Sequence, residues 1–292
     1  MNQNGRFPVR VETHCLHVKL PVVSCFELEA PRTLICFELE ASDERCEPPY
    51  RGVVSNVTGV AEEDERAARL LDAQAKAVEL FGEIERRGLI AAGRGERAVS
   101  DTIRELANEM FGVRKFWHKR IVRAGPNTLH PYRVNPPDRL IAEDDIVFCD
   151  FGPIFADWEA DFGRTFVIGD DPVKHRLRDD LPRIWDGGRR CFEQRPGITG
   201  EQLCAEVRRL IAEAGWEHGA PYAGHLVGEF PHERINGDDI EFYIAPGSDQ
   251  PMRRPDRAGR RCHWILEIHV IDRARGFGGF HEELLDLGHA PA

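Results

Sequence analysis

The expected helices and strands of this chain run through the same order twice, and this repetition is the strongest constraint on its fold. Each time a long amphipathic helix comes first, a shorter helix follows, and apolar strands close the unit. The predicted helices span residues 61–88, 99–111, 171–194 and 201–216, and the predicted strands span 119–125, 264–272, 279–288 and the two segments around Asp150 and Asp161. The repetition predicts an α+β fold of two pseudo-twofold helix–helix–β-hairpin units, with the sheets facing inward and the helices outside.

The starts of the two shorter helices support the repetition. Ser100 precedes the second helix and Thr199 precedes the fourth, so each half places a hydroxyl side chain where an N-cap is preferred. Thr199 and Gln202 also have the spacing of a capping box. We therefore expect the two halves to begin their second helix in the same way.

Residues 1–60 differ from the rest of the chain. The hexapeptide CFELEA occurs at 25–30 and again at 36–41, and no pattern of reactive side chains accompanies it. We expect two parts, namely a short N-terminal segment of unknown role over residues 1–60 and one larger domain over residues 61–292.

Composition narrows the class of protein. Of the 292 residues, 41% are hydrophobic and 30% are charged, which is typical of a globular domain. The formal net charge of −11 argues against nucleic acid as a partner, because such proteins normally carry a basic face. No apolar run is long enough to cross a membrane, and the N-terminus lacks the layout of a signal peptide, so we expect a cytoplasmic protein without a membrane partner. None of the 8 cysteines forms a CxxC pair, which favours free thiols.

Two aspartates stand where apolar residues are expected. Asp150 and Asp161 lie in runs that otherwise resemble buried strands, where an unpaired charge costs several kcal/mol. Asp157 and Glu159 are less surprising, because they fall where a turn between the two strands is expected. Either cations neutralise Asp150 and Asp161, or these strands are less buried than their composition indicates.

His225, Glu267 and Glu282 also lie in segments that are otherwise apolar or glycine-rich. Taken singly, Asp161 could pair with Arg164, His225 could be a core histidine, and Glu267 could face solvent. Together with Asp150, these residues form an oxygen-rich set with a single nitrogen, which suits Mn²⁺, Co²⁺, Fe²⁺ or Zn²⁺. Four carboxylates also balance the charge of two divalent cations, an arrangement used in hydrolysis. The five candidate residues are Asp150, Asp161, His225, Glu267 and Glu282.

Four segments of the chain resemble the pita-bread metallopeptidases, the superfamily of methionine aminopeptidase, aminopeptidase P, prolidase and creatinase. DFGPIFADWEADFGRTFVIG resembles the hairpin with two metal-binding aspartates 11 apart, and GHLVGEFPH resembles the family's histidine segment. WILEIHV and GFHEELL resemble the strands that bear the last two ligands. The resemblance extends over residues 65–287 and implies the pita-bread fold, with Xaa-Pro aminopeptidase or dipeptidase-like members as the nearest branch.

The resemblance also implies roles for individual residues. The implied metal ligands are Asp150, Asp161, His225, Glu267 and Glu282, with Glu283 as the alternative to Glu282. The implied catalytic residues are His130, His232 and Glu267, and the implied substrate-binding residues are His118, His269 and Arg164. The implied cofactors are two divalent metal ions, with Mn²⁺ ahead of Co²⁺, Fe²⁺ and Zn²⁺.

The implied reaction is hydrolysis of a short peptide with proline in the second position by a metal-bridging hydroxide. The implied partners are a small peptide or small amide substrate and a second copy of the chain in a homodimer. Two alternatives use the same fold, namely a creatinase-like hydrolase of a small non-peptide C–N bond and a metal-free binding module. The chain departs from the aminopeptidases at Ile268 and His269, because proline usually follows the fourth ligand in those enzymes.

Overall fold

The computed structural model describes residues 51–232 and 239–287. By spatial clustering the chain divides into Met1–Arg51 and Gly52–Ala292, and the description below concerns the second unit. The repeated CFELEA hexapeptide lies outside the described residues. Among the described helices, none combines the length and the apolar character that a membrane crossing requires.

A seven-stranded sheet forms the centre of the unit, and all of its neighbouring strands are antiparallel. The strands follow the order β1-β2-β5-β9-β8-β6, and β7 pairs with β8 beside this path. A separate two-stranded hairpin, β3 (Ile154–Phe155) and β4 (Trp158–Glu159), connects β2 to β5. The bounds of the sheet strands are β1 Ile121–Ala124, β2 Ile146–Phe151, β5 Phe162–Val167, β6 Glu217–His218, β7 Gly224–Val227, β8 His263–Asp272 and β9 Phe277–Leu284.

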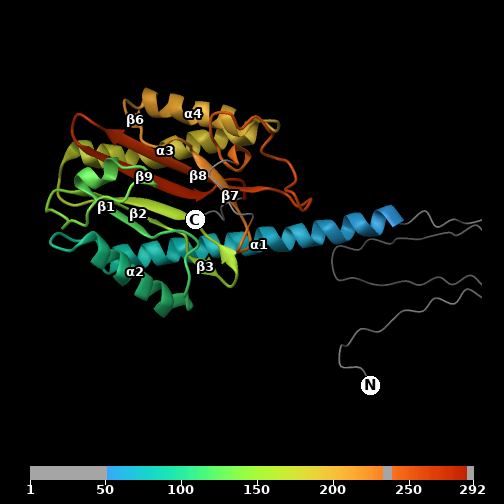
Figure 1. Ribbon diagram of the computed structural model, residues 1–292, viewed down its shortest axis with the longest axis horizontal. Helices are drawn as coiled ribbons and strands as arrows, with labels where there is room; N and C mark the ends of the chain where they lie inside the picture. The colour runs from blue at the N-terminus through green and yellow to red at the C-terminus, as the bar shows by residue number, and fades with distance from the viewer. Residues whose placement is uncertain (1–50, 233–238, 288–292) are drawn as a thin grey trace, which may run out of the picture. The chain divides into compact units, whose positions relative to one another are not determined.

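Four α-helices cover the sheet in two pairs. Figure 1 shows α1 (Arg51–Arg86) and α2 (Glu96–Phe111) along one side of the sheet, and α3 (Pro172–Gln194) and α4 (Gly200–Glu213) along the other. Two 3₁₀ helices, Gly125–Leu129 and Ile240–Phe242, lie in the connections. Burial of one apolar stripe of each helix against the sheet is the main force that holds these layers together.

Each helix pair has its own hydrophobic core. Leu80 of α1 and Ile103 of α2 pack in one cluster with Val147 of β2. Leu177 of α3 packs in a second cluster with Leu266 of β8. Within the sheet, the two halves join where β5 pairs with β9 at Gly163 and Glu282, and Thr165 of β5 adds side-chain hydrogen bonds to the backbone of Phe280. This arrangement confirms the predicted α+β class and the repeated order of helices and strands.

The helix starts were predicted with mixed success. Thr199 caps α4 and forms the expected capping box with Gln202. Ser100 does not cap α2, so that prediction was wrong. The helix begins at Glu96. The buried carboxylate of Glu96 accepts hydrogen bonds from the Ala124 backbone N–H and from the side-chain amide of Asn127, and these long-range bonds extend the helix by a turn. Helix α1 begins at Arg51, before the start expected near residue 61.

The cysteines of the described residues are reduced, as expected. Cys149, Cys191, Cys204 and Cys262 are all buried and form no disulfide. The four cysteines of the N-terminal segment lie outside the described residues.

Candidate metal centre

Three of the predicted ligands stand in one row across the sheet. Asp150 of β2 is paired with Gly163 of β5, Gly163 with Glu282 of β9, and Glu282 with Glu267 of β8. Directly opposed residues of antiparallel strands project to the same face. The register of four strands therefore brings three carboxylates onto one face of the sheet.

Gly163 is the member of this row without a side chain. A Cβ atom at this position would lie 2.5 Å from Cδ1 of Phe280 and 3.2 Å from Cβ of Glu282. Real Cβ atoms do not approach other heavy atoms as closely as 2.5 Å. Glycine therefore leaves the space in which the carboxylates converge.

Burial decides between the two explanations for the aspartates. The exposed fractions of Asp150, Asp161, Glu267 and Glu282 are 6%, 2%, 7% and 1%. The strands are therefore buried as their composition indicates, and charge on these groups must be compensated within the protein.

His225 faces the carboxylates from β7. Its Nε2 atom lies 3.1 Å from Oδ2 of Asp161 and 3.8 Å from Oε1 of Glu282. Its Nδ1 atom is 2.8 Å from the carbonyl oxygen of Leu226, so Nδ1 is the natural donor and Nε2 is left facing the acids. Metal-binding histidines commonly use this arrangement, in which one nitrogen is fixed by a carbonyl and the other binds the metal.

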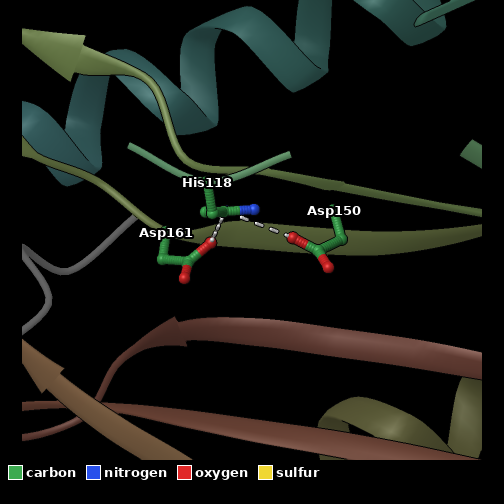
Figure 2. Close-up of side chains that lie close together, drawn as sticks. All are labelled: His118, Asp150 and Asp161. Atoms are coloured by element: carbon green, nitrogen blue, oxygen red, sulfur yellow. Dashed lines mark hydrogen bonds and ion pairs between the residues drawn. The ribbon is translucent and has the colours of Figure 1, made fainter. Parts of the chain in front are cut away.

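His118 faces the same cluster from the segment that precedes β1. Its Nε2 atom lies 3.0 Å from Oδ1 of Asp161 and 3.5 Å from Oδ1 of Asp150, and Figure 2 shows the ring directed at both aspartates. Its Nδ1 atom lies 2.7 Å from the carbonyl oxygen of Lys119. The sequence placed His118 among substrate-binding residues, whereas the structure brings it against the predicted ligands.

The donor atoms form two overlapping groups that could each hold a metal ion. One group is His118, Asp150 and Asp161, the other is Asp161, His225 and Glu282, and within each group the atoms lie within 4.8 Å of one another. Asp150 Oδ1 and Glu282 Oε2 are buried and accept no hydrogen bond from the described residues. Buried oxygens of this kind, together with imidazole nitrogens, fit divalent cations such as Mn²⁺ or Zn²⁺.

Three of the carboxylates have raised pKa values and are therefore protonated more readily than free acids. Burial raises the pKa of Asp150 to about 7, although the nearby His118 opposes the change. Burial also raises the pKa of Glu267 to about 8, with His225 opposing. For Glu282, burial and the charges of Asp161 and Asp150 raise the pKa well above its usual value. Cations would remove this penalty, because they stabilise the ionised carboxylates.

For Asp161 and His118, burial does not set the direction of the pKa shift. Burial disfavours the charged forms of both, but their mutual attraction is stronger. The pKa of Asp161 is therefore lowered, and the pKa of His118 is raised to about 9 by Asp161 and Asp150. Asp161 is thus the acid of the cluster that holds its negative charge most firmly.

The cluster opens into a cavity of about 150 Å³. Besides the six ionisable residues, the cavity is lined by four aromatic residues, Trp117, Tyr132, Tyr222 and Tyr243. The rings of Tyr222 and Tyr243 are 4.9 Å apart. The sequence analysis did not select these aromatic residues, since single aromatic residues in loops carry no periodic pattern.

His130 and His269 line a second, smaller cavity of about 30 Å³ beside the first. The two cavities share Asp150 and Glu267. The Nε2 atom of His269 lies 2.9 Å from the carbonyl oxygen of Thr128, and burial lowers the pKa of His269 to about 4. Both histidines are therefore close to the carboxylates without belonging to either donor group.

His232 lies beside Trp117, with 5.7 Å between the ring centroids. Its Nδ1 atom contacts the Glu159 carboxylate, which also accepts a hydrogen bond from the Gly228 backbone N–H. Glu159 was expected in the turn, but it lies in β4 and is almost fully buried, while Asp157 does lie in the turn between β3 and β4. The Glu159 carboxylate orients His232, a role that the sequence analysis did not assign.

Arg164 lies outside the cavity of the carboxylates. Its guanidinium pairs with Glu283, donates to the backbone oxygen of Glu282 at 2.9 Å, and packs 3.7 Å from the centroid of the Phe162 ring. It lines a separate hollow beside α1. Glu282 therefore stands beside the other carboxylates, and Glu283 with Arg164 supports the strand from the opposite face.

The chain matches the family model "Metallopeptidase family M24" over residues 67–255. It is 30% identical to an Xaa-Pro dipeptidase of Pyrococcus horikoshii over 146 residues, which cover 49% of this chain and 40% of that protein. It is 33% identical to a probable dipeptidase PepE of Mycobacterium tuberculosis over 160 residues, which cover 51% of this chain and 41% of that protein. The matches thus span less than half the length of these two relatives.

The fold agrees with these matches. The crystal structure of dipeptidase PepE from Mycobacterium ulcerans superposes with a TM-score of 0.59 and 25% identity, covering 77% of this chain and 59% of that chain. A buried cluster of carboxylates and histidines on a pita-bread fold defines a class of metal-binding enzymes. The chain belongs to metallopeptidase family M24.

Proposed function

We propose that this chain is a dinuclear metal-dependent hydrolase that cleaves short peptides with proline in the second position. The proposal depends on one observation above all. Two groups of donor atoms share Asp161 and face a single cavity of about 150 Å³. The names of the relatives, which include Xaa-Pro dipeptidases, support the choice of substrate.

The chemistry of the cations is the first element of the proposed mechanism. When bound, two divalent cations, with Mn²⁺ as the first choice, would lower the pKa of a water molecule and polarise the substrate carbonyl. Asp150, Asp161, His225, Glu267 and Glu282 would hold them. Asp161 belongs to both donor groups.

The chain's own side chains would handle protons and position the peptide. Glu267 lines both cavities, and its carboxylate would take a proton from the attacking water and return it to the leaving nitrogen. His232 or His130 would donate a hydrogen bond to the oxygen that becomes negative in the transition state. The contact of Nδ1 with Glu159 fixes the ring of His232, so that Nε2 is the atom available for this bond.

The cavity wall suits a small, partly apolar substrate. Trp117, Tyr132, Tyr222 and Tyr243 offer ring faces against which a proline ring can pack, and the volume of about 150 Å³ excludes large side chains. His118 and His269, which line the first and the second cavity, would contact the substrate. Arg164 is not part of the proposed substrate site, because it lines a different hollow.

The proposal extends to the whole protein in three further respects. The hydrolase domain spans residues 61–292, with residues 1–60 as a separate segment. Two chains associate as a homodimer, and the protein is cytoplasmic. These statements depend on the resemblance to the family and on the sequence composition.

Metal content by mass spectrometry tests the proposal first. The protein is purified without a metal-affinity tag, loaded with Mn²⁺ and desalted, in parallel with Asp161→Asn and Asp157→Asn. We expect close to two equivalents in the wild type and in Asp157→Asn, an exposed aspartate of the same hairpin, and a sharp loss in Asp161→Asn. The loaded wild type should then hydrolyse dipeptides that end in proline.

Two results would contradict the proposal. Absence of bound metal in the wild type would exclude the dinuclear hydrolase. Hydrolysis of a small C–N substrate that persists in chelator, and fails without His225, would favour a creatinase-like enzyme. A chain with neither metal nor turnover would be a binding module.

A further inference from the structure

We propose that His118 is a sixth protein ligand of the metal centre and that its Nε2 atom binds the cation held by Asp150 and Asp161. This inference depends on the proposed dinuclear site and goes beyond it, because the five ligands implied by the family resemblance do not include this residue.

The first argument is the direction of the ring. Nε2 of His118 lies 3.0 Å from Asp161 Oδ1 and 3.5 Å from Asp150 Oδ1, and the side chain is only 5% exposed. Its Nδ1 atom is fixed at 2.7 Å by the carbonyl oxygen of the next residue, Lys119. His225 has the same arrangement, with Nδ1 fixed at 2.8 Å by the carbonyl oxygen of its own next residue. The two imidazoles are thus anchored alike and directed at the same acids.

The second argument is that the surrounding chain makes room for this ring. A Cβ atom at Gly152 would lie 2.2 Å from Cδ2 and 2.4 Å from Nε2 of His118. The backbone of Trp117 donates to the carbonyl oxygen of Gly152 at 2.9 Å, and its indole donates to that of Ala160 at 3.1 Å. The segment that carries His118 is therefore fastened to the hairpin at two positions between Asp150 and Asp161, one next to the strand that carries Asp150 and one next to Asp161.

The third argument is the division of the donors between the two halves. The first half supplies Asp150 and Asp161, and the second supplies Glu267 and Glu282. His225 adds a nitrogen from the second half, and His118 adds one from the first. Each of the two donor groups then contains carboxylates and one imidazole.

This ligand set has a consequence for metal preference. Carboxylate-rich sites suit Mn²⁺, whereas imidazole ligands suit Zn²⁺ and Co²⁺ better. A second imidazole should therefore raise the affinity for Co²⁺ and Zn²⁺ more than the affinity for Mn²⁺. A histidine that only contacts substrate would leave all three affinities unchanged.

The experiment compares Co²⁺ and Mn²⁺ binding by calorimetry in the wild type, His118→Phe and the control His130→Phe. His130 is a fair control because it lines the neighbouring cavity without belonging to a donor group. In His118→Phe we expect one of the two Co²⁺ equivalents to bind at least about 10-fold more weakly, since loss of a partner of a metal ligand alone costs about 10- to 100-fold. The Mn²⁺ affinity should fall less, the visible spectrum of one Co²⁺ equivalent should change, and His130→Phe should match the wild type.

X-ray absorption of the zinc-loaded wild type gives a second test that needs no variant. Ligation by both His118 and His225 predicts an average of one imidazole per zinc, and ligation by His225 alone predicts half of that. The lower count, or wild-type Co²⁺ affinities and spectrum in His118→Phe, would overturn the inference and leave the proposed function standing. A wild type that binds no cation would overturn both.

Discussion

In the absence of metal ions, the stability of this protein should fall as the pH rises from 6.5 to 8. Burial raises the pKa of Glu267 from 4.5 to about 8. For His118, burial acts against ionisation, but Asp161 and Asp150 outweigh it and raise the pKa from 6.5 to about 9. In this window both groups keep protons in the folded chain that the unfolded chain has released. Stability from a raised pKa is lost as the pH rises, so both groups act in the same direction.

The size of the effect follows from the number of protons. Each additional proton bound by the folded chain lowers the free energy of unfolding by about 1.4 kcal/mol per pH unit. Glu267 and His118 alone account for about 1.5 such protons across the window, a loss of about 3 kcal/mol, or roughly 6–12 °C in melting temperature for a chain of this size. Asp150 and Glu282, whose pKa values are also raised by burial, act in the same direction. His218 and His269, whose pKa values are lowered from 6.5 to about 4 by burial, oppose this trend mainly below pH 6.5, and their effect fades between pH 6.5 and 7.5.

Thermal melts in chelator at constant ionic strength, at intervals from pH 6.5 to 8, measure the effect. The matched control is Glu267→Gln, which should melt with a smaller pH dependence because an amide does not titrate. Saturating Mn²⁺ should reverse the trend, since cation binding requires deprotonated carboxylates. A melting temperature in chelator that stays constant or rises over this interval would refute the reasoning.

Three substitutions test the fold by urea denaturation. Gly163→Ala should cost about 1–3 kcal/mol, because its Cβ would lie 2.5 Å from Phe280, whereas Gly197→Ala, with no atom within 4 Å, should be neutral. Equal stability of these two variants would contradict the role given to Gly163. Leu177→Ala should cost about 2–5 kcal/mol, since Leu177 is fully buried in the second core, and a loss below this range would show that the core collapses around it. Thr199→Ala should cost about 1 kcal/mol through loss of the capping box, and an unchanged midpoint would show that the cap is dispensable.

The sequence contained enough information to predict the carboxylate cluster. Asp150, Glu267 and Glu282 are charged residues in apolar strands, and this local contrast survives without knowledge of the fold. The period of two along a strand also separates Asp161 from Arg164, which are three residues apart and therefore face opposite sides of the sheet. That separation was available from the sequence and argues against Arg164 as a substrate contact.

The positions of His118 and Glu159 could not be predicted in this way. His118 reaches the aspartates because the preceding Trp117 donates hydrogen bonds to the carbonyl oxygens of Gly152 and Ala160. These hydrogen bonds join segments that are distant in the sequence. Glu159 is buried because the β3–β4 hairpin brings its carboxylate to the backbone of Gly228. Both cases depend on long-range hydrogen bonds in loops, for which the sequence has no periodic pattern.

The single residue pair between β5 and β9 also affects how the protein is made. The donors of the first half, on β2 and before β5, are synthesised well before Glu267 and Glu282, and the pair Gly163–Glu282 forms only after β9 has left the ribosome. A growing chain therefore presents two aspartates without the acids that complete the cluster. The candidate site is therefore assembled only once β8 and β9 are made, and a product that stops before β8 would carry only the donors of the first half.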